Sequence, residues 1–420
     1  MSDKFVIYGG KPLSGTIEMA GSKNAAGPIL AASLLTDEEV IIDNLPLVSD
    51  IVNLIEVLKG IGAEIEWLSP RKIRIKAKNI NSQNLDFDKI AKTRVSVLLI
   101  GPLLARFRNF KMARPGGDKI GIRPIYTHLE ALKKLGAEIS IEGDFYQFKT
   151  KELKGGEVVL KEFSVTATEN VMMAAVLAQG KTRIMGAACE PHVQDLGKML
   201  ILMGAKIEGL GTHTIEIEGV EKLHGISYKI ISDPIEAGTF MIAGCLTSGQ
   251  VEIKNIESEH LTLFLDKLEE AGVNFKKELN SISVNYSPNL KAVRVQALPY
   301  PGFPTDLLPI FAAFLTQAEG KSLIHDPLYE NRFSHLQELR KMGADIEMVD
   351  PHRAIIFGKT SLQGLKIESW DIRAGAALII AGLVAQGKTT IENVFQIDRG
   401  YEKIEEKLQK LGADIKRIRA

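Results

Sequence analysis

Hydrophobic and polar residues follow two recurring patterns along the chain. The first is a helix with one apolar and one polar face, such as "LEALKKLG", followed by an alternating strand such as "AEISIE". A glycine at the end of a helix commonly adopts the left-handed conformation, so it marks where each helix stops. This glycine recurs at intervals of 74, 68, 68, 71 and 69 residues, at positions 62, 136, 204, 272, 343 and 412.

The second pattern is a helix of small residues that is apolar nearly all round, which predicts a buried helix. One such segment precedes each repeated glycine; the six are "NAAGPILAASLL", "SVLLIGPLLARF", "NVMMAAVLAQG", "AGTFMIAGCLTSG", "DLLPIFAAFLTQAEG" and "AGAALIIAGLVAQG". Six units in 420 residues predict an α/β fold of two pseudo-threefold domains with three units each. A solenoid is the alternative, although a unit of roughly 70 residues is long for a stacking repeat.

Charge and composition exclude several function classes. The chain has 52 basic and 52 acidic residues, so net charge gives no reason to expect binding to nucleic acid or to an anionic membrane. The longest uncharged apolar run, 374–385, is too short to cross a bilayer, and the first residues lack the apolar core of a signal peptide. Cys189 and Cys245 fit neither a metal site nor a disulfide framework. We therefore expect a cytosolic protein.

Charged or amide residues stand at the starts of the predicted buried helices: Lys23, Asn24, Arg94, Asp306, Asp371 and Arg373. The N-terminus of a helix has free N–H donors and a partial positive charge, which suit phosphate or carboxylate groups. For Ser22, Thr305 or Asp371 taken singly, ordinary capping of the first turn is the better explanation. It does not explain Lys23 and Arg94, because a cation at a helix start opposes the dipole unless an anion lies beside it.

A glycine-rich loop, "RPGGDKIGIRP" at residues 114–124, places several cations around one carboxylate, Asp118. Glycines allow a backbone to approach a ligand closely, and the cations favour an anion. A second glycine motif, "GLVAQGKT" at 382–389, matches the P-loop pattern, which requires a strand before it and a helix after it. Here an apolar helix precedes the motif and a strand-like segment follows, so we interpret the match as accidental and an ATPase as disfavoured.

Several segments together resemble the UDP-N-acetylglucosamine enolpyruvyl transferases, from about residue 5 to the C-terminus. They are "GSKNAAGPIL", "GPLLARF", "PGGDKIGIRP", "SVTATENVMMAA", "FPTD", "ENRFSHLQELRKMGA" and "IDRGYEKIEEKLQKLGA". The resemblance implies the inside-out α/β barrel of the enolpyruvyl transferase fold. It also implies a first domain, 23–231, that carries a mobile loop, 112–122, and a second domain made of 1–22 with 232–420. The active site is then expected in the cleft between the domains.

The implied reaction transfers the enolpyruvyl group of phosphoenolpyruvate to the 3-hydroxyl of UDP-N-acetylglucosamine and releases phosphate, by addition followed by elimination. In this family it is the first committed step of bacterial peptidoglycan synthesis. The resemblance implies no metal and no organic cofactor, a cytoplasmic location, and only the two small-molecule substrates as partners. It leaves the oligomeric state open.

The resemblance also implies residue roles. Lys23, Arg123 and Arg399 match the cations around phosphoenolpyruvate, with Asn24 beside them. Asp118 is the implied proton donor to the methylene carbon, at a position where most relatives have Cys and a minority have Asp. Asp306, near the sugar hydroxyl, is the candidate base.

Further positions match contacts to the nucleotide sugar: Arg94, Arg123, Pro124, Ile125, Tyr126, Thr127, Ser164, Val165, Asp306 and Leu328. Arg332, Asp371 and Arg373 match supporting charged positions. The alternative interpretation, above all for Arg332 and Arg373, is a solvated surface or an ion-pair network between the domains.

Departures from the family pattern cluster on the nucleotide side, at Tyr126, Thr127, Glu162 and Thr166. They leave two alternatives open: the same chemistry on another acceptor, or a catalytically silent paralogue that binds ligands. The presence of Lys23, Asp118, Asp306 and Arg399 together argues against a silent protein. Because Asp118 lacks a nucleophilic thiol, we also expect resistance to the epoxide antibiotic fosfomycin.

Overall fold

The computed structural model describes residues 3–118 and 120–419. These residues form two compact units. We call Gly21–Asp118 with Arg123–Ile231 the N-terminal unit, and residues 3–20, 120–122 and 232–419 the C-terminal unit. The loop expected to be mobile, 112–122, includes Lys119, which lies outside the described residues.

The loop begins later than predicted, and part of it groups with the other unit. Strand β6 (Asn109–Ala113) continues through Met112 and Ala113, which are buried and pair with Tyr146 and Phe145, so irregular backbone begins only at residue 114. Segment 120–122 groups with the C-terminal unit, although the predicted ranges kept it in the first domain. Backbone bonds account for this grouping. The Ile122 N–H donates to Glu330 Oε1 (2.7 Å), and the Asn331 N–H donates to the Ile120 carbonyl (3.1 Å).

Among the described residues the strands form six sheets, three in each unit, as six repeats predict. In five of these sheets one edge strand pairs in parallel with its neighbour while the other pairings are antiparallel. The N-terminal unit contains the sheets β13-β3-β5-β4, β6-β8-β7 and β11-β12-β10-β9. Apart from β6, their strands are β3 (Glu39–Asp43), β4 (Glu64–Ser69), β5 (Lys72–Lys76), β7 (Glu138–Glu142), β8 (Phe145–Lys149), β9 (Glu157–Val159), β10 (Lys181–Met185), β11 (Lys206–Glu208), β12 (Thr214–Glu218) and β13 (Ser227–Lys229).

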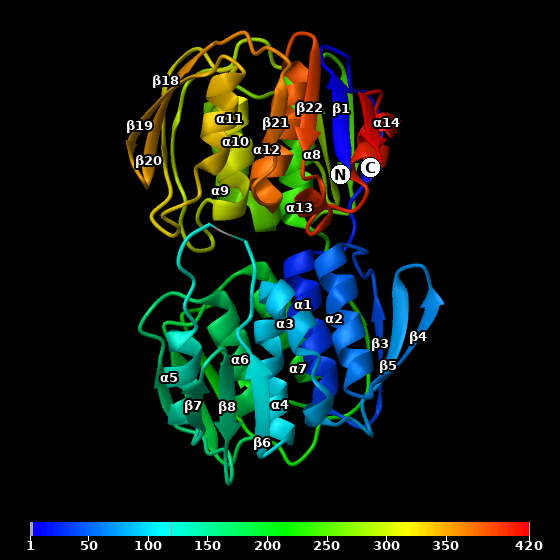
Figure 1. The fold of residues 1–420 in the computed structure, drawn as a ribbon, viewed down its shortest axis with the longest axis vertical. Helices are drawn as coiled ribbons and strands as arrows, with labels where there is room; N and C mark the ends of the chain where they lie inside the picture. Colours follow the sequence, from blue (N-terminus) through cyan, green and yellow to red (C-terminus); the bar gives the residue numbers. More distant parts are fainter. Residues whose placement is uncertain (1–2, 119, 420) are drawn as a thin grey trace. The chain divides into compact units, whose positions relative to one another are not determined.

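The C-terminal unit contains the sheets β21-β22-β1-β23, β15-β16-β14-β2 and β17-β18-β20-β19. The first of these joins both ends of the chain, because Phe5 lies opposite Ile391 on one side and Arg417 on the other (Figure 1). The strands are β1 (Lys4–Tyr8), β2 (Gly15–Glu18), β14 (Gln250–Lys254), β15 (Phe275–Lys277), β16 (Ser281–Asn285), β17 (Arg294–Gln296), β18 (Gly320–His325), β19 (Asp345–Asp350), β20 (Arg353–Gly358), β21 (Lys366–Glu368), β22 (Lys388–Glu392) and β23 (Asp414–Ile418).

The apolar segments form buried helices, as predicted, and their side chains build the core of each unit. In the C-terminal unit, helices from three different repeats pack against one another (Figure 1). The buried helices are α1 (Lys23–Ala32), α4 (Ile100–Arg106), α6 (Val165–Ala175), α8 (Pro234–Leu246), α10 (Leu308–Leu315) and α12 (Ile372–Val384).

The two-faced helices bury mainly their apolar sides, together with a few polar residues such as Asp50 and His335. Each repeated glycine that ends one of them has a φ angle between 84° and 106°, which confirms the predicted left-handed stop. The two-faced helices are α2 (Ser49–Gly60), α5 (Tyr126–Lys134), α7 (Pro191–Leu202), α9 (Thr262–Glu270), α11 (Ser334–Lys341) and α14 (Ile404–Lys410).

Short helical segments complete the secondary structure: α3 (Phe87–Lys92), α13 (Phe395–Asp398), η1 (Ser33–Leu35), η2 (Ser82–Asn84), η3 (Arg94–Leu99), η4 (Ser258–Leu261) and η5 (Thr305–Leu307). The P-loop interpretation fails in the structure, because α12 ends at Val384 and strand β22 follows Gly387. Phosphate-binding loops need the reverse order, a strand and then a helix.

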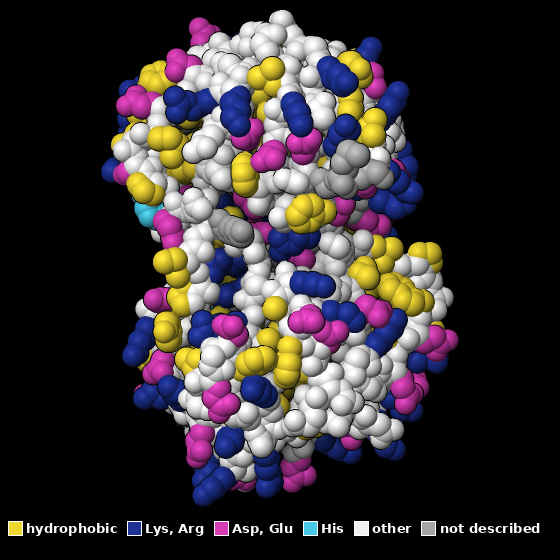
Figure 2. Space-filling model, in the orientation of Figure 1, with side chains coloured by type: hydrophobic (Ala, Val, Ile, Leu, Met, Phe, Trp, Pro, Cys, Tyr) yellow, Lys and Arg dark blue, Asp and Glu magenta, His cyan; other side chains and the backbone are white. Residues whose placement is uncertain are grey.

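Acidic and basic side chains are interspersed over the face drawn in Figure 2, in keeping with the zero net charge. Across residues 3–118 and 120–419, none of the helices combines the length and the apolar character needed to cross a membrane.

Candidate functional site

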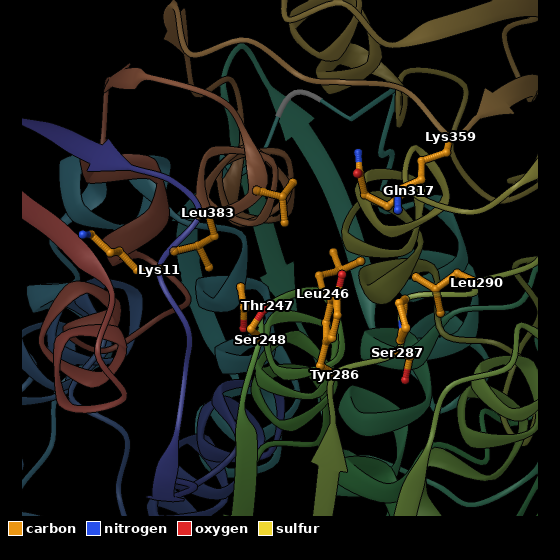
Figure 3. A pocket seen from close by; sticks show the side chains of 13 residues that line it. Lys11, Leu246, Thr247, Ser248, Tyr286, Ser287, Leu290, Gln317, Lys359 and Leu383 are labelled. Atoms are coloured by element: carbon orange, nitrogen blue, oxygen red, sulfur yellow. The ribbon is translucent and has the colours of Figure 1, made fainter.

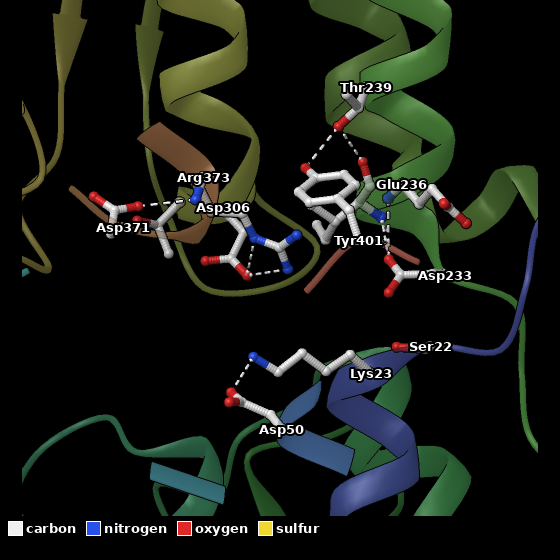
Figure 4. A network of polar contacts seen from close by, with 12 residues as sticks. Ser22, Lys23, Asp50, Asp233, Glu236, Thr239, Asp306, Asp371, Arg373 and Tyr401 are labelled. Carbon is white, nitrogen blue, oxygen red and sulfur yellow. Dashed lines mark hydrogen bonds and ion pairs between the residues drawn. The ribbon is translucent and has the colours of Figure 1, made fainter. Parts of the chain in front are cut away.

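Helix α1 of the N-terminal unit begins at Lys23, and the Ser22 hydroxyl caps it by accepting the Ala25 N–H (3.4 Å). The Lys23 ammonium contacts Asp50 Oδ2 at 2.7 Å, and the two side chains are only 12% and 4% exposed (Figure 4). Asp50 lies in the first turn of α2, where a carboxylate also favours the helix dipole. The anion that the sequence predicts beside Lys23 is thus at least partly supplied by the protein itself.

Asp50 is a residue that the sequence interpretation missed. The available signal was an acidic residue in the first turn of a surface helix, but that signal does not say which cation the carboxylate meets. Asn24, the next residue of α1, is half-buried.

Arg94 opens η3 and holds the end of the glycine-rich loop. Its Nη1 donates to the Arg123 carbonyl (2.7 Å), and its Nη2 donates to the Pro124 carbonyl (3.4 Å). Gly117 lies so close that a Cβ there would come within 2.8 Å of Arg94 Cβ, and its φ of +131° further restricts the position to glycine. Asp118, which follows directly, is half-buried. The structure therefore brings Arg94, Asp118 and Arg123 into one region of the N-terminal unit.

The departures from the family pattern meet where α5 and α6 begin. The Thr127 hydroxyl donates to Glu162 Oε2 (3.3 Å), and Thr166 Oγ1 is hydrogen-bonded to His128 Nε2 (2.8 Å). Burial, assisted by the positive charge of Arg94, lowers the pKa of His128 to about 3, so its imidazole is neutral. The Ser164 hydroxyl caps α6 by accepting the Ala167 N–H (3.3 Å).

The remaining predicted nucleotide contacts lie on the same two elements. Val165 is the first residue of α6, Tyr126 begins α5 and is 66% exposed, and Ile125 is buried just before it.

In the C-terminal unit, two arginines hold Asp306. Arg332 Nη2 donates to Asp306 Oδ1 (2.6 Å), while Arg373 donates to Oδ2 from Nε (3.1 Å) and Nη2 (2.9 Å) (Figure 4). Burial opposes ionisation of this carboxyl, yet the guanidinium groups of Arg373 and Arg332 outweigh it and hold the pKa of Asp306 well below its ordinary value. Arg332 and Arg373 thus form an ion-pair network with Asp306 inside the C-terminal unit, and Asp306 is ionised as a base must be.

Asp371 connects this network to α12, because its Oδ1 accepts the N–H groups of Arg373 (2.8 Å) and Ala374 (2.9 Å). Its capping role, which the sequence left as an alternative, is thus present. Thr305 is not a cap: its hydroxyl donates to Asp326 Oδ2 (2.6 Å). The Leu328 N–H also bonds to Asp326, at Oδ1 (2.8 Å).

Arg399 follows α13, and its Nη1 donates to Gln396 Oε1 (2.9 Å). The next residues pack on the start of α12. A Cβ at Gly400 would lie 2.4 Å from Ile372 Cγ2, and the Arg373 guanidinium lies 5.2 Å from the centroid of the Tyr401 ring. The C-terminal unit therefore brings Asp306, Arg332, Asp371 and Arg373 into one network and places the Arg399 segment against the same helix.

A separate hollow lies at the other ends of these helices. It has a volume of about 230 Å³ and is lined by residues at or just after the C-terminal ends of α8, α10 and α12, such as Thr247, Gln317 and Leu383 (Figure 3). The predicted site residues instead lie at the N-terminal ends of α10 and α12, so this hollow is distinct from them. Across the residues described, no group of three or more His, Cys, Asp or Glu side chains is arranged to hold a metal ion.

The chain matches one family model over residues 7–408, described as EPSP synthase (3-phosphoshikimate 1-carboxyvinyltransferase). It is 46% identical over 419 residues to the UDP-N-acetylglucosamine 1-carboxyvinyltransferase of Koribacter versatilis, covering 99% of this chain and 96% of that protein. It is 45% identical to the enzyme of the same name from Halothermothrix orenii, covering 99% of this chain and 100% of the relative.

Solved structures agree at the level of the fold. The enolpyruvyl transferase NikO from Streptomyces tendae superposes with a TM-score of 0.91 at 23% identity, covering 100% of both chains. EPSP synthase from Acinetobacter baumannii superposes with a TM-score of 0.77 at 20% identity, covering 99% of this chain and 100% of the other. The predicted enolpyruvyl transferase fold is confirmed. The chain belongs to the enolpyruvyl transferase family, in the branch of the UDP-N-acetylglucosamine 1-carboxyvinyltransferases.

Proposed function

We propose that this protein transfers the enolpyruvyl group of phosphoenolpyruvate to the 3-hydroxyl of UDP-N-acetylglucosamine and releases phosphate. The observation that carries the proposal is the identity of 45–46% to enzymes named for this transfer, over 99% of the chain. In cells this reaction would begin peptidoglycan synthesis, and we propose a cytoplasmic location for it. The two substrates are the partners we expect.

Addition forms the new bond. The sugar oxygen attacks C2 of phosphoenolpyruvate, and the methylene carbon C3 accepts a proton, which gives a tetrahedral intermediate that still carries phosphate. Elimination then breaks the bond between C2 and the phosphate oxygen while C3 loses a proton. The products are the enol ether and inorganic phosphate, and no oxidant or reductant is needed.

Asp306 is the proposed base for the sugar hydroxyl. The two guanidinium groups that bind Asp306 keep its carboxylate ionised and fix the orientation of both oxygens. They also weaken it as a proton acceptor, because a carboxylate with a lowered pKa holds a proton poorly. Asp306 therefore serves best as a transient acceptor whose main contribution is to orient the hydroxyl.

Asp118 is the proposed proton donor to C3, and the cations proposed for the phosphate and carboxylate of phosphoenolpyruvate are Lys23, Arg123 and Arg399, with Asn24. Backbone N–H groups at the start of α6 suit the diphosphate of the nucleotide sugar, because helix N-termini favour anions. The other proposed contacts to the nucleotide sugar are Arg94, Pro124, Ile125, Tyr126, Thr127, Ser164, Val165 and Leu328. The cleft between the two predicted domains stays a prediction as the place where all these residues meet.

Phosphate release with different acceptors tests the proposal. The purified protein is incubated with phosphoenolpyruvate and either UDP-N-acetylglucosamine or shikimate 3-phosphate, and inorganic phosphate is measured over time. Release should require UDP-N-acetylglucosamine. Release with shikimate 3-phosphate alone would assign another acceptor, and release with neither acceptor would contradict the proposed transfer.

A further inference from the structure

The last strand of the chain contributes an arginine that the proposed reaction does not use. Arg417 lies on β23 and is bidentate to Asp398, with Nη1 donating to Oδ2 (2.9 Å) and Nη2 donating to Oδ1 (2.6 Å). Its Nε donates to Glu405 Oε1 (2.6 Å). The guanidinium also lies 4.8 Å from the centroid of the Phe5 ring, so it is fixed on several sides.

These bonds join both ends of one short connection. Asp398 is the last residue of α13, and Glu405 lies in the first turn of α14. One guanidinium from the edge strand therefore holds the entry and the exit of the turn 399–403. Paired N–H···O bonds from arginine to a carboxylate fix direction as well as distance, which a single ammonium contact cannot do.

The middle of the turn is also held. Tyr401 is 1% exposed, and its hydroxyl is hydrogen-bonded to Thr239 Oγ1 (2.9 Å) on α8 (Figure 4). Gly400 packs against Ile372 at the start of α12. The backbone of Arg399 and Gly400 is therefore bracketed by the Asp398 contact on one side and the buried Tyr401 on the other.

We infer that Arg417 is a positioning residue for phosphoenolpyruvate binding: it orients Arg399 through Asp398. The inference rests on the proposed function, in which Arg399 binds the anionic substrate. Both oxygens of Asp398 accept hydrogen bonds from Arg417, so the direction of the carboxylate next to Arg399 is fixed from β23. Loss of Arg417 releases both the backbone of the turn and that carboxylate.

Arg417→Gln and Arg417→Lys test the inference. We expect Arg417→Gln to raise the KM for phosphoenolpyruvate about 10- to 100-fold, as for a small displacement of a binding group, while the KM for UDP-N-acetylglucosamine stays within about twofold. Arg417→Lys keeps the charge but not the paired geometry, so it should restore only part of the affinity. The matched control is Arg353→Gln, because Arg353 makes an ion pair with Asp350 in another sheet of the same unit (2.7 Å). It should leave both KM values unchanged.

A double-variant cycle separates positioning from general stability. If Arg417 acts through Arg399, adding Arg417→Gln to Arg399→Lys should raise the KM for phosphoenolpyruvate much less than it does in the wild type. Multiplicative effects, or a lowered melting temperature with an unchanged KM, would overturn the inference. Should Arg417→Gln fail to fold, Asp398→Asn takes its place with the same expected KM change.

Phosphate release by the wild-type enzyme distinguishes a failure of this inference from a failure of the proposed function. Phosphate release by the wild type, together with an unaffected KM in the Arg417 variants, would refute only the positioning role. No phosphate release by the wild type would refute the proposed function, and the positioning role with it.

Discussion

The buried histidine His335 of α11 makes folding stability depend on pH in a way that can be calculated. Burial, assisted by the nearby positive charge of Arg332, lowers its pKa to about 3 in the folded protein. In the unfolded chain an imidazole has a pKa of about 6.5. Between these values the unfolded chain binds a proton that the folded protein does not, so stability falls as the pH falls below about 6.5.

The size of the effect follows from the two pKa values. Lowering the pH from 8 to 5 passes through about 1.5 pH units of this window, and each unit corresponds to about 1.4 kcal/mol. His335 should therefore remove about 2 kcal/mol of unfolding free energy over that range. Other buried groups also contribute to the pH dependence of the unfolding free energy. Burial, with Glu190 nearby, raises the pKa of Glu169, which works in the opposite direction, so the effect must be measured as a difference between variants.

Denaturant unfolding of His335→Gln beside the wild type, at pH 5 and pH 8, isolates this contribution. The chain has two tryptophans, so Trp67→Phe leaves Trp370 as the fluorescent reporter in the C-terminal unit. The wild type should lose about 2 kcal/mol more than the variant between the two pH values. His224→Gln is the control, because solvent reaches that exposed imidazole in folded and unfolded chains alike. An equal loss in wild type and His335→Gln would refute the reasoning.

Substitutions at three further positions test the proposed roles and contacts. Asp306→Asn removes the proposed base while keeping its shape, so kcat should fall about 10²- to 10⁴-fold in the phosphate-release assay. Asp118→Asn should abolish turnover, whereas Asp118→Cys should retain some; mass spectrometry should find a covalent fosfomycin adduct on the Cys variant and none on the wild type. Asp50→Ala removes the carboxylate that Lys23 contacts, so the free energy of unfolding should fall by about 3 kcal/mol, as for a broken buried ion pair.

For each of these predictions, one experimental outcome would contradict it. Full activity of Asp306→Asn would exclude Asp306 as the base, and an active Asp118→Asn enzyme would exclude Asp118 as the proton donor. The control for Asp50 is Glu56→Ala on the same helix, whose exposed contact with Lys59 (2.9 Å) should be worth less than about 1 kcal/mol. Equal losses in the two variants would show that burial does not strengthen the Lys23–Asp50 pair.

The repeat architecture could be predicted from sequence because its signals are local. An all-round apolar helix has to be buried, and a glycine after an amphipathic helix has to end it, so the six buried helices and the stop at Gly62 follow from the residues themselves. The P-loop match at 382–389 could be rejected from local signals too, because the sequence itself predicts a helix before Gly387 and a strand after it.

Contacts between distant residues could not be predicted in this way. The hydrophobic pattern shows only that Asp50 is an acidic residue at the start of a helix. No local feature of the sequence indicates that it contacts Lys23, which lies 27 positions earlier. The partners of Arg417 could not be predicted from local sequence either. On an edge strand it looks like an ordinary solvated cation, and the sequence does not show that Asp398 and Glu405, at the two ends of the turn between α13 and α14, are its hydrogen-bond partners. The resemblance places Met112 and Ala113 in the loop, whereas pairing with β8 extends the strand through both residues.

The most direct test of the central claim follows both products of one reaction. The enzyme is supplied with phosphoenolpyruvate and UDP-N-acetylglucosamine in heavy water, and phosphate is quantified while the nucleotide sugar is analysed by mass spectrometry. Addition and elimination at the same carbon predict one phosphate released for each nucleotide sugar that gains an enolpyruvyl group, with deuterium incorporated into its methylene carbon. Phosphate release without a modified nucleotide sugar, or an unchanged mixture with folded enzyme, would contradict enolpyruvyl transfer.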